Sequence, residues 1–441
     1  MKYFPISPEQ MENRLQSLGY SSAADLFRSI PESLRVRTDA RLPAPASEIE
    51  IRREYQPSEA APIEHNFMGG NGHFHYIPSV IDPLISRGEF LTAYTPYQPE
   101  VSQGSLQAMF EFQSMMADLM GVEVSNASLY DGSTAMIEAA MMAVRVRRKD
   151  RVVFADSIHP EYLETMQTYA NSGVFETAMV PTDASGRLDI ATLKETLNAD
   201  TAALVVQSPN YYGIIEDIAS IKKELEEHNI MLIVTVTEAM SMALVKSPGG
   251  QGADIVCGEA QSFGVPLSYG GPWLGFIGTS QKHMRSLPGR LIGEAKDMDG
   301  RRAFVVTLAA REQHIRRQKA TSNICTNQGL MALRCTIYLE LMGKKGLRRA
   351  AERSARFAAL GRQLLREQTD LKLKYPDSPI FNEFMIETPV AAETVFDRCM
   401  KASRVACGTV AGPNQLLVSF NETMSPEAVK QWVLSVKAAS K

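Results

Sequence analysis

The stretch Gly258–Pro272, GEAQSFGVPLSYGGP, has the composition of a tight turn between two strands. An apolar run, Ala253–Cys257, precedes it and reads as a short buried strand. A second apolar run, Trp273–Gly278, follows the turn-forming residues YGGP. Because glycine lets the backbone approach a neighbouring group closely, the stretch predicts a turn that brings main chain near whatever lies above the sheet.

Gln261 occupies the position in this turn at which many pyridoxal-phosphate (PLP) enzymes carry the lysine that holds the cofactor as a Schiff base. An amide nitrogen is not nucleophilic and cannot form that imine, so the chain has the frame of a lysine-dependent site without its nucleophile. An ordinary strand–turn–strand with Gln261 at the surface explains the same residues, because a short motif is only a hypothesis. The rest of the chain has to decide between the two interpretations.

Size and composition exclude several classes of protein. The chain has 441 residues, of which 22% are charged, and a net charge of -4. A chain of this length can bury a large core without disulfides or metal ions, and its near-neutral balance predicts neither nucleic acid nor membrane as a partner. The five cysteines form no CxxC pair, and no run of about 18 apolar residues occurs. We therefore expect a cytoplasmic protein with reduced thiols.

Two loops have compositions that suit binding. Residues 66–74 read NFMGGNGHF, where the glycines let a ligand or backbone approach closely. His73 and His75 could in principle bind a metal ion, but no further ligands lie nearby in sequence, so no metal site is predicted. Residues 92–100 read TAYTPYQPE, and the prolines exclude a helix interior. The two tyrosines of this loop either pack internally or present hydroxyl groups to a ligand.

A glycine–hydroxyl turn opens a predicted helix. Gly132-Ser133-Thr134 immediately precede the helix Met136–Arg147. Backbone N–H groups, two hydroxyls and the positive end of the helix dipole would form a phosphate cradle there. The same three residues are also an ordinary helix N-cap, so both interpretations stay open. A Met-rich helix farther upstream, Ser105–Met120, is typical of a protein core.

From Arg151 onward, continuous apolar strands alternate with helices, which predicts a mostly parallel sheet covered on both faces. Ligands of such sheets lie beyond the carboxyl ends of the strands. Glu238 follows one of these strands, at a place where PLP enzymes typically carry a carboxylate for the pyridinium nitrogen. A capping or surface role for Glu238 is equally compatible. The strands are expected at 152–154, 178–180, 202–206 and 230–236, and the helices at 159–170, 190–197 and 218–228.

The pattern divides the chain into three parts. Residues 1–60 predict an N-terminal helical extension, in which Ser7 and Ser47 begin helices. Residues 61–345 predict a large α/β domain. Residues 346–441 predict a small C-terminal α+β domain in which strands and helices alternate.

Four stretches of the chain together resemble one family. They are TAYTPYQPEVSQG (92–104), NASLYDGSTAMIEAA (126–140), QSFGVPLSYGGP (261–272) and RRQKATSNICTNQ (316–328). Through them, and over essentially its full length, the chain resembles the P-protein family of the glycine cleavage system, in its two-subunit form and on the side of the subunit that lacks the lysine. The resemblance implies the aspartate-aminotransferase-like fold of PLP-dependent transferases, fold type I. One departure is TVTEAM at 235–240, where an Ala-Asp-Pro-like stretch is expected, and it puts a role for Glu238 in doubt.

The resemblance also implies an activity and a division of labour. The enzyme would be an aminomethyl-transferring glycine dehydrogenase, in which glycine reacts with PLP, CO2 leaves, and the aminomethyl group passes to the lipoyl arm of H-protein. A homologous, lysine-bearing sister subunit would bind PLP covalently in an α2β2 assembly, and this chain would complete its active site. The implied contacts to the sister site are Tyr94, Thr95, Tyr97 and Gln98; Gly132, Ser133 and Thr134 would be a remnant phosphate cradle, and Asn66, Ser322, Asn323 and Thr326 would line the substrate channel.

Two other functions compete with this one. The chain could be a stand-alone PLP enzyme with a displaced lysine, for which Lys282 is the nearest downstream candidate. Lys282 comes after the strand Trp273–Gly278, too far along the chain to replace Gln261 without rebuilding the turn. The chain could also be a free-standing scaffold that has lost any catalytic association, in which case no neighbouring reading frame would encode a similar chain with lysine at this position.

Overall fold

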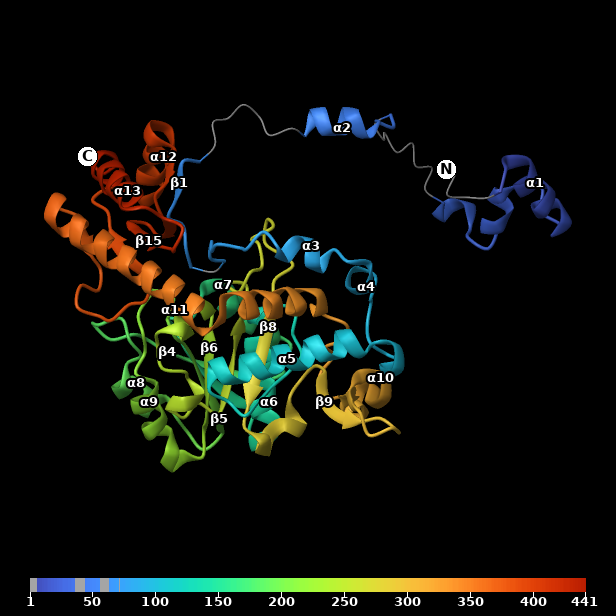
Figure 1. The fold of residues 1–441 in the computed structure, drawn as a ribbon, viewed down its shortest axis with the longest axis horizontal. Helices are drawn as coiled ribbons and strands as arrows, with labels where there is room; N and C mark the ends of the chain where they lie inside the picture. Colours follow the sequence, from blue (N-terminus) through green and yellow to red (C-terminus); the bar gives the residue numbers. More distant parts are fainter. Residues whose placement is uncertain (1–5, 36–43, 56–62, 71) are drawn as a thin grey trace. The chain divides into compact units, whose positions relative to one another are not determined.

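The structure, a computed structural model, describes residues 6–35, 44–55, 63–70 and 72–441 (Figure 1). The chain forms two compact units, residues 1–61 and residues 62–441. The second unit contains every candidate site residue named above.

The first unit consists of short helices. The Ser7 hydroxyl accepts a hydrogen bond from the Gln10 N–H at 3.2 Å, and the Gln10 side chain accepts one from the Ser7 N–H at 2.9 Å. Ser47 and Glu50 form the same reciprocal pair, so both predicted helix starts are confirmed as capping boxes. Leu15 is buried, whereas most other apolar side chains of this unit are exposed. The helices are α1 (Pro8–Ser17), η1 (Ala23–Phe27), η2 (Glu32–Leu34) and α2 (Glu48–Glu54).

A seven-stranded sheet forms the centre of the second unit, in the order β2-β8-β7-β6-β5-β3-β4. The strands from β7 to β4 are parallel, and β8 runs antiparallel to β7. Strands β5 and β6 are fully buried and rich in β-branched residues, as expected for a parallel sheet with both faces covered. The strands are β2 (Val124–Ser125), β3 (Arg151–Ala155), β4 (Glu176–Val180), β5 (Thr201–Gln207), β6 (Met231–Val236), β7 (Ile255–Glu259) and β8 (Gly275–Thr279).

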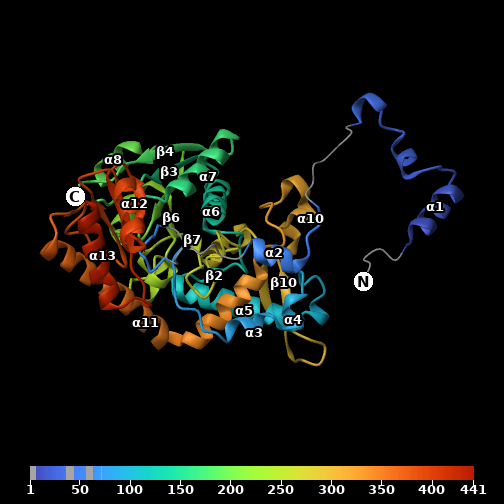
Figure 2. The same cartoon turned by 90° about the horizontal axis from the view of Figure 1, so that it is seen from above.

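Helices cover both faces of this sheet (Figure 2). In β7, Ile255 and Cys257 pack into the core beneath α6, whereas Val256 between them packs into the core beneath α5 and α11. This alternation follows from the two-residue period of a strand. The covering helices are α5 (Gln103–Met120), α6 (Gly132–Arg147), α7 (Pro160–Asn171), α8 (Ile190–Thr196), α9 (Ile218–Leu225) with η4 (Glu226–His228), η5 (Ala239–Ala243), η6 (Gly249–Gln251) and α11 (Gly329–Gln368).

Helix α11 is interrupted once along its length. Gly343 has φ of 55° and ψ of 178°, a conformation that leaves the helical region and bends the chain. Among the described residues, no helix is both long enough and apolar enough to cross a bilayer.

A β-hairpin follows the last strand of the central sheet. Strand β9 (Leu291–Lys296) pairs antiparallel with β10 (Arg302–Thr307), and β10 packs Phe304 against Leu106 of α5. The short elements after the hairpin are η8 (Ala309–Arg311), α10 (Gln313–Arg316) and η9 (Arg317–Lys319), and η7 (Gln281–Ser286) lies before it. The short elements ahead of α5 are α3 (Ile81–Ile85), α4 (Gly88–Leu91) and η3 (Pro99–Val101).

The C-terminal region has its own antiparallel sheet, in the order β11-β12-β15-β14, and a separate core around Trp432. The early segment β1 (His65–Asn66) pairs with β13 (Val405–Ala406) and so joins this region to the beginning of the unit. The predicted domain boundary near residue 346 stays a prediction. The elements are β11 (Lys372–Leu373), β12 (Glu383–Glu387), α12 (Ala392–Ser403), β14 (Thr409–Gly412), β15 (Gln415–Ser419) and α13 (Pro426–Ala439).

Candidate functional site

Gln261 is buried, and both ends of its side-chain amide are bonded within the chain. Its Oε1 accepts a hydrogen bond from the His73 N–H at 2.9 Å, and its Nε2 donates to the Val265 carbonyl at 2.7 Å. Only 3% of the residue is exposed. The surface-glutamine interpretation is therefore wrong: the amide ties the Gln261 turn to the glycine-rich loop that carries His73.

The phosphate cradle predicted at Gly132 already holds a carboxylate of the same chain. Glu259 lies at the end of β7, and its Oε2 accepts a hydrogen bond from the Gly132 N–H at 3.0 Å. Its Oε1 accepts from the N–H groups of Leu274 at 2.7 Å and Gln261 at 3.0 Å. Burial raises the pKa of Glu259 to about 8, against the opposing effect of the bonds from Leu274 and Gly132.

Asp131 occupies the remaining donors of the cradle. Its Oδ1 accepts from the Thr134 N–H at 2.7 Å and from the Ser133 hydroxyl at 2.9 Å. Asp131 is thus the N-cap of α6, and the ordinary capping role describes Ser133 and Thr134 in this structure. The adjacent cavity, of about 410 Å³, is lined by the carboxylates of Asp131, Glu161 and Glu259.

Glu238 lies at the end of β6, where the sequence placed a ligand-facing carboxylate, and it is buried among histidines. His75 Nε2 lies 3.0 Å from Glu238 Oε2, and its Nδ1 lies 2.8 Å from Glu422 Oε2. His73 Nδ1 lies 3.2 Å from Glu238 Oε2, without hydrogen-bond geometry. Glu238 Oε1 also accepts from the Ser262 hydroxyl at 2.7 Å and caps η5 through the Met240 N–H.

The charges of this cluster support one another. Burial alone would lower the pKa of His75, but the charge of Glu238 and the hydrogen bonds to Glu238 and Glu422 raise it to about 10. Burial alone would raise the pKa of Glu238, but His73 and His75 lower it to about 2. His75 is therefore an imidazolium held between two carboxylates at neutral pH. Among the described residues, no group of three or more His, Cys, Asp or Glu side chains could hold a metal ion.

The residues around Gln261 do not fit PLP. The amide at 261 is not a nucleophile, and both oxygens of Glu238, to which a pyridinium nitrogen would donate, already bond to His75 and Ser262. A phosphate at Gly132 would have to displace Glu259 and would meet the charge of Asp131. The hydrogen-bonding groups that PLP would need in this filled pocket are occupied by the chain's own side chains, although a cavity of about 410 Å³ remains beside them.

Three further residues at this pocket carry no sequence signal that would have found them. His159 caps α7 and lies edge-on to Tyr211, with ring centroids 5.2 Å apart. Burial, helped by the charge of His73, lowers the pKa of His159 to about 4. Glu383 accepts from the Gly70 N–H at 2.9 Å, and Glu422 accepts from the Tyr76 N–H at 2.7 Å. Glu383 and Glu422 lie more than 300 positions from their partners.

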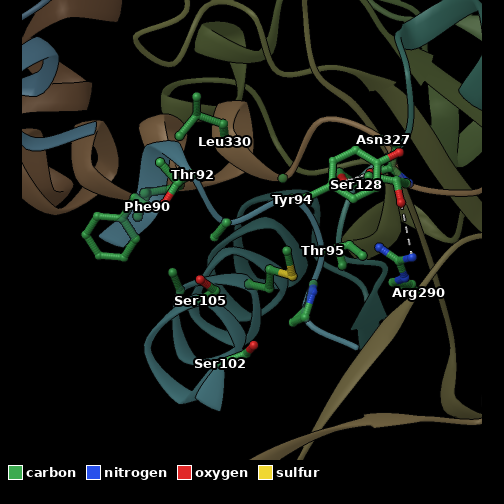
Figure 3. A pocket seen from close by; sticks show the side chains of 18 of the residues that line it. Phe90, Thr92, Tyr94, Thr95, Ser102, Ser105, Ser128, Arg290, Asn327 and Leu330 are labelled. Carbon is green, nitrogen blue, oxygen red and sulfur yellow. Dashed lines mark hydrogen bonds between the residues drawn. The ribbon is translucent and has the colours of Figure 1, made fainter. Parts of the chain in front are cut away.

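The loop 92–96 lines a separate cavity of about 520 Å³ (Figure 3). Tyr94 and Thr95 line one end of it together with Ser128, Arg290 and Asn327, and Phe90, Thr92 and Leu330 lie toward the other end. The full lining also includes Leu91, Ala93, Pro96, Val101, Ser102, Ser105, Ala108, Met109, Ala127, Thr326, Gly329 and Leu333.

The Thr92 hydroxyl of this loop donates to the Gly88 carbonyl at 2.6 Å, but the side chains that follow it are not satisfied in this way. Tyr94 is 81% exposed and Tyr97 is 67% exposed, so neither ring packs internally. The Thr95 hydroxyl is shielded from solvent and has no hydrogen-bond partner among the described residues. The Tyr97 ring lies under the Arg290 guanidinium, 5.7 Å from it, whereas Gln98 is exposed and does not line the cavity.

The four channel candidates do not come together. Thr326 lines the cavity, and its hydroxyl accepts from Arg290 Nη2 at 3.4 Å. Ser322 is half-buried in the same loop, with its side chain against the Glu138 carboxyl group of α6. Asn323 is exposed. Asn66 lies in β1, and its side chain accepts from the Met68 N–H at 2.9 Å. A channel role for these residues remains a prediction.

Lys282 lies far from the Gln261 turn. It belongs to η7, which follows the carboxyl end of β8. Strand β8 is antiparallel to β7, and Thr279 lies opposite Ile255 at the start of β7. Helix η7 therefore begins at the end of the strands opposite to the end at which Glu259 and Gln261 lie. A lysine at that edge cannot replace Gln261.

Comparison with known sequences gives one consistent result. A family model described as glycine cleavage system P-protein matches residues 1–436. A probable glycine dehydrogenase (decarboxylating) subunit 1 from Geotalea uraniireducens is 46% identical over 437 residues, covering 97% of this chain and 98% of the relative. Another, from Koribacter versatilis, is 45% identical over 401 residues, covering 90% of each chain.

Solved structures agree with the sequence relatives. The crystal structure of glycine decarboxylase (P-protein) of the glycine cleavage system, in inhibitor-bound form, superposes with a TM-score of 0.91 at 36% identity over 100% of both chains. A NifS-like protein superposes with a TM-score of 0.63 at 13% identity over 85% of this chain and 98% of the other, a likeness that concerns the fold alone. The predicted α/β fold of a fold type I PLP-dependent transferase is confirmed.

Proposed function

Because the chain belongs to the P-protein family of the glycine cleavage system, we propose that it is the lysine-lacking subunit of a two-subunit glycine decarboxylase. A homologous sister subunit carries the lysine and binds PLP covalently, and this chain completes that subunit's active site. The assembly is α2β2 in the cytoplasm, and its activity is that of an aminomethyl-transferring glycine dehydrogenase.

The observation that carries the proposal is the contrast between the filled pocket and the open loop. Gln261, Glu238 and Glu259 have partners within the chain. The Tyr94 ring is exposed, and the Thr95 hydroxyl has no hydrogen-bond partner among the described residues. Both residues line the cavity. A chain that fills its own cofactor pocket and leaves a rigid, hydroxyl-rich loop unpartnered is suited to serve a neighbour's site.

The residues of this chain would position and shield rather than perform covalent chemistry. PLP, when bound on the sister subunit, supplies the electron sink for loss of CO2 from glycine. The Pro-bounded loop holds the Tyr94, Thr95 and Tyr97 hydroxyls on a stiff backbone, where they can donate to an anionic group. Phe90 and Leu330, both half-buried, form an apolar part of the same cavity wall.

The second substrate is the lipoyl arm of H-protein, which receives the aminomethyl group. A long and mobile arm needs an open channel rather than a closing segment. Thr326, in the loop that also carries Ser322 and Asn323, lines the same cavity as the proposed sister contacts Tyr94 and Thr95. We propose this loop as one wall of the channel; Asn66 would contribute only from the distant β1.

Co-expression with the sister chain tests the proposal. We expect a complex in size-exclusion chromatography that exchanges bicarbonate into the carboxyl group of glycine, and neither chain alone should do so. Borohydride reduction and peptide mapping should label one lysine of the sister chain and none of this chain. A labelled lysine at 282 or elsewhere in this chain would instead support a stand-alone PLP enzyme.

The scaffold alternative has its own outcome in the same experiment. A free-standing scaffold would form no complex with the lysine-bearing chain, and adding it would leave the exchange rate of that chain unchanged. A sharp melting transition of this chain that the sister does not affect would point the same way.

A further inference from the structure

The cavity lined by Tyr94 and Thr95 contains one positively charged side chain, that of Arg290. Its guanidinium makes one long hydrogen bond, from Nη2 to the Thr326 hydroxyl at 3.4 Å (Figure 3). The Tyr97 ring beneath it, at 5.7 Å, fixes its plane by a cation–π contact. A guanidinium has five N–H donors, so most of its hydrogen-bonding capacity is unused.

No carboxylate of the described residues neutralises Arg290. The ion pairs of this part of the chain join Arg302 to Glu294, Arg301 to Asp299 and His314 to Glu312, and none involves Arg290. The nearest polar groups in the cavity are neutral: the hydroxyls of Thr95 and Ser128 and the amide of Asn327.

A second arginine adds to the positive charge beside the cavity. Arg311 donates from Nη2 to the carbonyl of Gly289, the residue before Arg290, at 2.9 Å. Its Nε and Nη1 are shielded from solvent and have no partner among the described residues. On the rim, a hydrogen bond from the Thr326 backbone lowers the pKa of the exposed Cys325 thiol, and the charge of Arg290 acts in the same direction.

We propose that Arg290 is the anchor for an oxyanion, a phosphate or a carboxylate, that the sister subunit presents to this cavity. The proposal rests on the proposed function, because the anion is supplied by a ligand bound on the partner. Thr326 and Tyr97 are positioning residues for the guanidinium, and the Thr95 hydroxyl, which has no partner among the described residues, lies on the same wall to donate to the same group. Arginine suits this role because its planar fork matches oxyanions.

The chemistry of the reaction favours phosphate over the carboxylate of glycine. As CO2 leaves, the carboxylate loses its negative charge, so a strong ion pair to it would stabilise the ground state more than the transition state. The phosphate ester of PLP keeps its charge throughout the reaction. We therefore expect Arg290 to retain cofactor rather than to bind glycine.

The test uses the assembled complex with Arg290→Gln, Arg290→Lys or the control Arg348→Gln in this chain. Arg348 is an exposed arginine of α11 whose partner is Glu352, so its loss removes the same charge away from the cavity. The first measurement is the PLP concentration that half-restores the cofactor absorbance of the resolved complex. The second is a spectral titration with glycine at saturating PLP.

The two measurements distinguish the possible anions. We expect Arg290→Gln to raise the half-restoring PLP concentration roughly tenfold or more, Arg290→Lys less, and Arg348→Gln not at all. A weaker glycine titration with unchanged PLP retention would support the anchor and identify the carboxylate as its ligand. If both values match the control while the complex assembles and exchanges glycine, the anchor is wrong and the proposed function stands. If the wild-type complex does not assemble or exchange, the proposed function fails. Should Arg290→Gln not assemble, Arg290→Lys and Thr326→Val provide the same two readings.

Discussion

The Gln261 turn and the Tyr94 loop both have the composition of ligand-binding segments, but the structure satisfies only one of them. Gln261 is bonded at both ends of its amide, and Glu259 and Glu238 hold backbone N–H groups and an imidazolium. At the other place the Tyr94 ring is exposed, the Thr95 hydroxyl is unpaired and Arg290 has one long bond. Satisfied polar groups stabilise a fold, whereas unsatisfied ones in a cavity mark a place for a ligand or partner.

The difference also concerns how the buried carboxylates around the Gln261 turn are balanced. Replacing lysine alone would leave an empty polar pocket whose carboxylates lack partners. Here His75 supplies the positive charge that the Glu238 carboxylate requires. The first prediction removes that carboxylate. The next ones test the Tyr94 loop, the titration of His75, and whether a lysine at position 261 restores PLP binding.

The largest expected effect is on stability, at Glu238. Glu238→Ala leaves the His75 charge buried with only Glu422 to balance it, and should lower the free energy of unfolding by about 3–5 kcal/mol. Urea denaturation of the complex measures this from the midpoint and slope. The exposed pair Glu294–Arg302 gives the matched control, because Glu294→Ala should change stability by less than about 0.5 kcal/mol. Equal effects at the two sites would mean that the cluster is not a supporting element.

The next effect concerns activity, at the open loop. Tyr94→Phe and Thr95→Val each remove one hydroxyl from a site proposed to recognise charge, at a cost of about 1.5–3 kcal/mol. Exchange activity or cofactor retention should fall roughly ten- to a hundredfold while the complex still assembles. Tyr169→Phe on α7 removes a hydroxyl that does not line this cavity and serves as control. Full activity in assembled Tyr94→Phe and Thr95→Val complexes would make the loop structural.

The third prediction is a pH dependence of the filled pocket. The folded-state pKa of His75 is raised from 6.5 to about 10, so its contribution to stability is complete below pH 6.5 and is lost as the pH rises toward 10. The stability difference between wild type and His75→Gln should therefore shrink steadily between pH 6.5 and pH 9.5. Urea midpoints at four pH values measure it. A constant or growing difference over this range would contradict a buried imidazolium.

The smallest expected effect is on cofactor binding by Gln261→Lys. Restoring the nucleophile leaves Glu259 and Asp131 on the donors that a phosphate needs, and His75 on Glu238. The isolated variant should therefore form no reducible adduct with PLP, as judged by absorbance and borohydride labelling. A stoichiometric label at position 261 would break the comparison, because it would mean that the pocket opens without further change.

Local patterns predicted the parts of this fold that local forces decide. The capping boxes at Ser7 and Ser47 and the strands of the parallel sheet follow from residue spacing and apolar runs. The β9–β10 hairpin was missed, although Asp299-Gly300 between alternating residues is a turn signal. The β1–β13 pairing carried no signal, because two-residue strands have no period to detect.

The sites show the same division between local and distant causes. Gln261 and the Tyr94 loop could be singled out from the sequence because each is one continuous stretch. The filling of the pocket could not, because His75 meets Glu422 across a separation of 347 positions. Arg290 was missed for the same reason. Its guanidinium contacts Thr326 and Tyr97, and these three residues lie on separate segments of the chain.

The link between His75 and Glu422 has a consequence for biosynthesis. A ribosome makes His75 347 positions before Glu422, so the growing chain leaves the pocket open while the sheet between them is synthesised. The β1–β13 pairing likewise waits for residue 405. Closure of the pocket therefore follows the synthesis of the sheet beside it. A chain terminated before residue 422 would leave the His75 imidazolium paired with Glu238 alone and its Nδ1 without an acceptor.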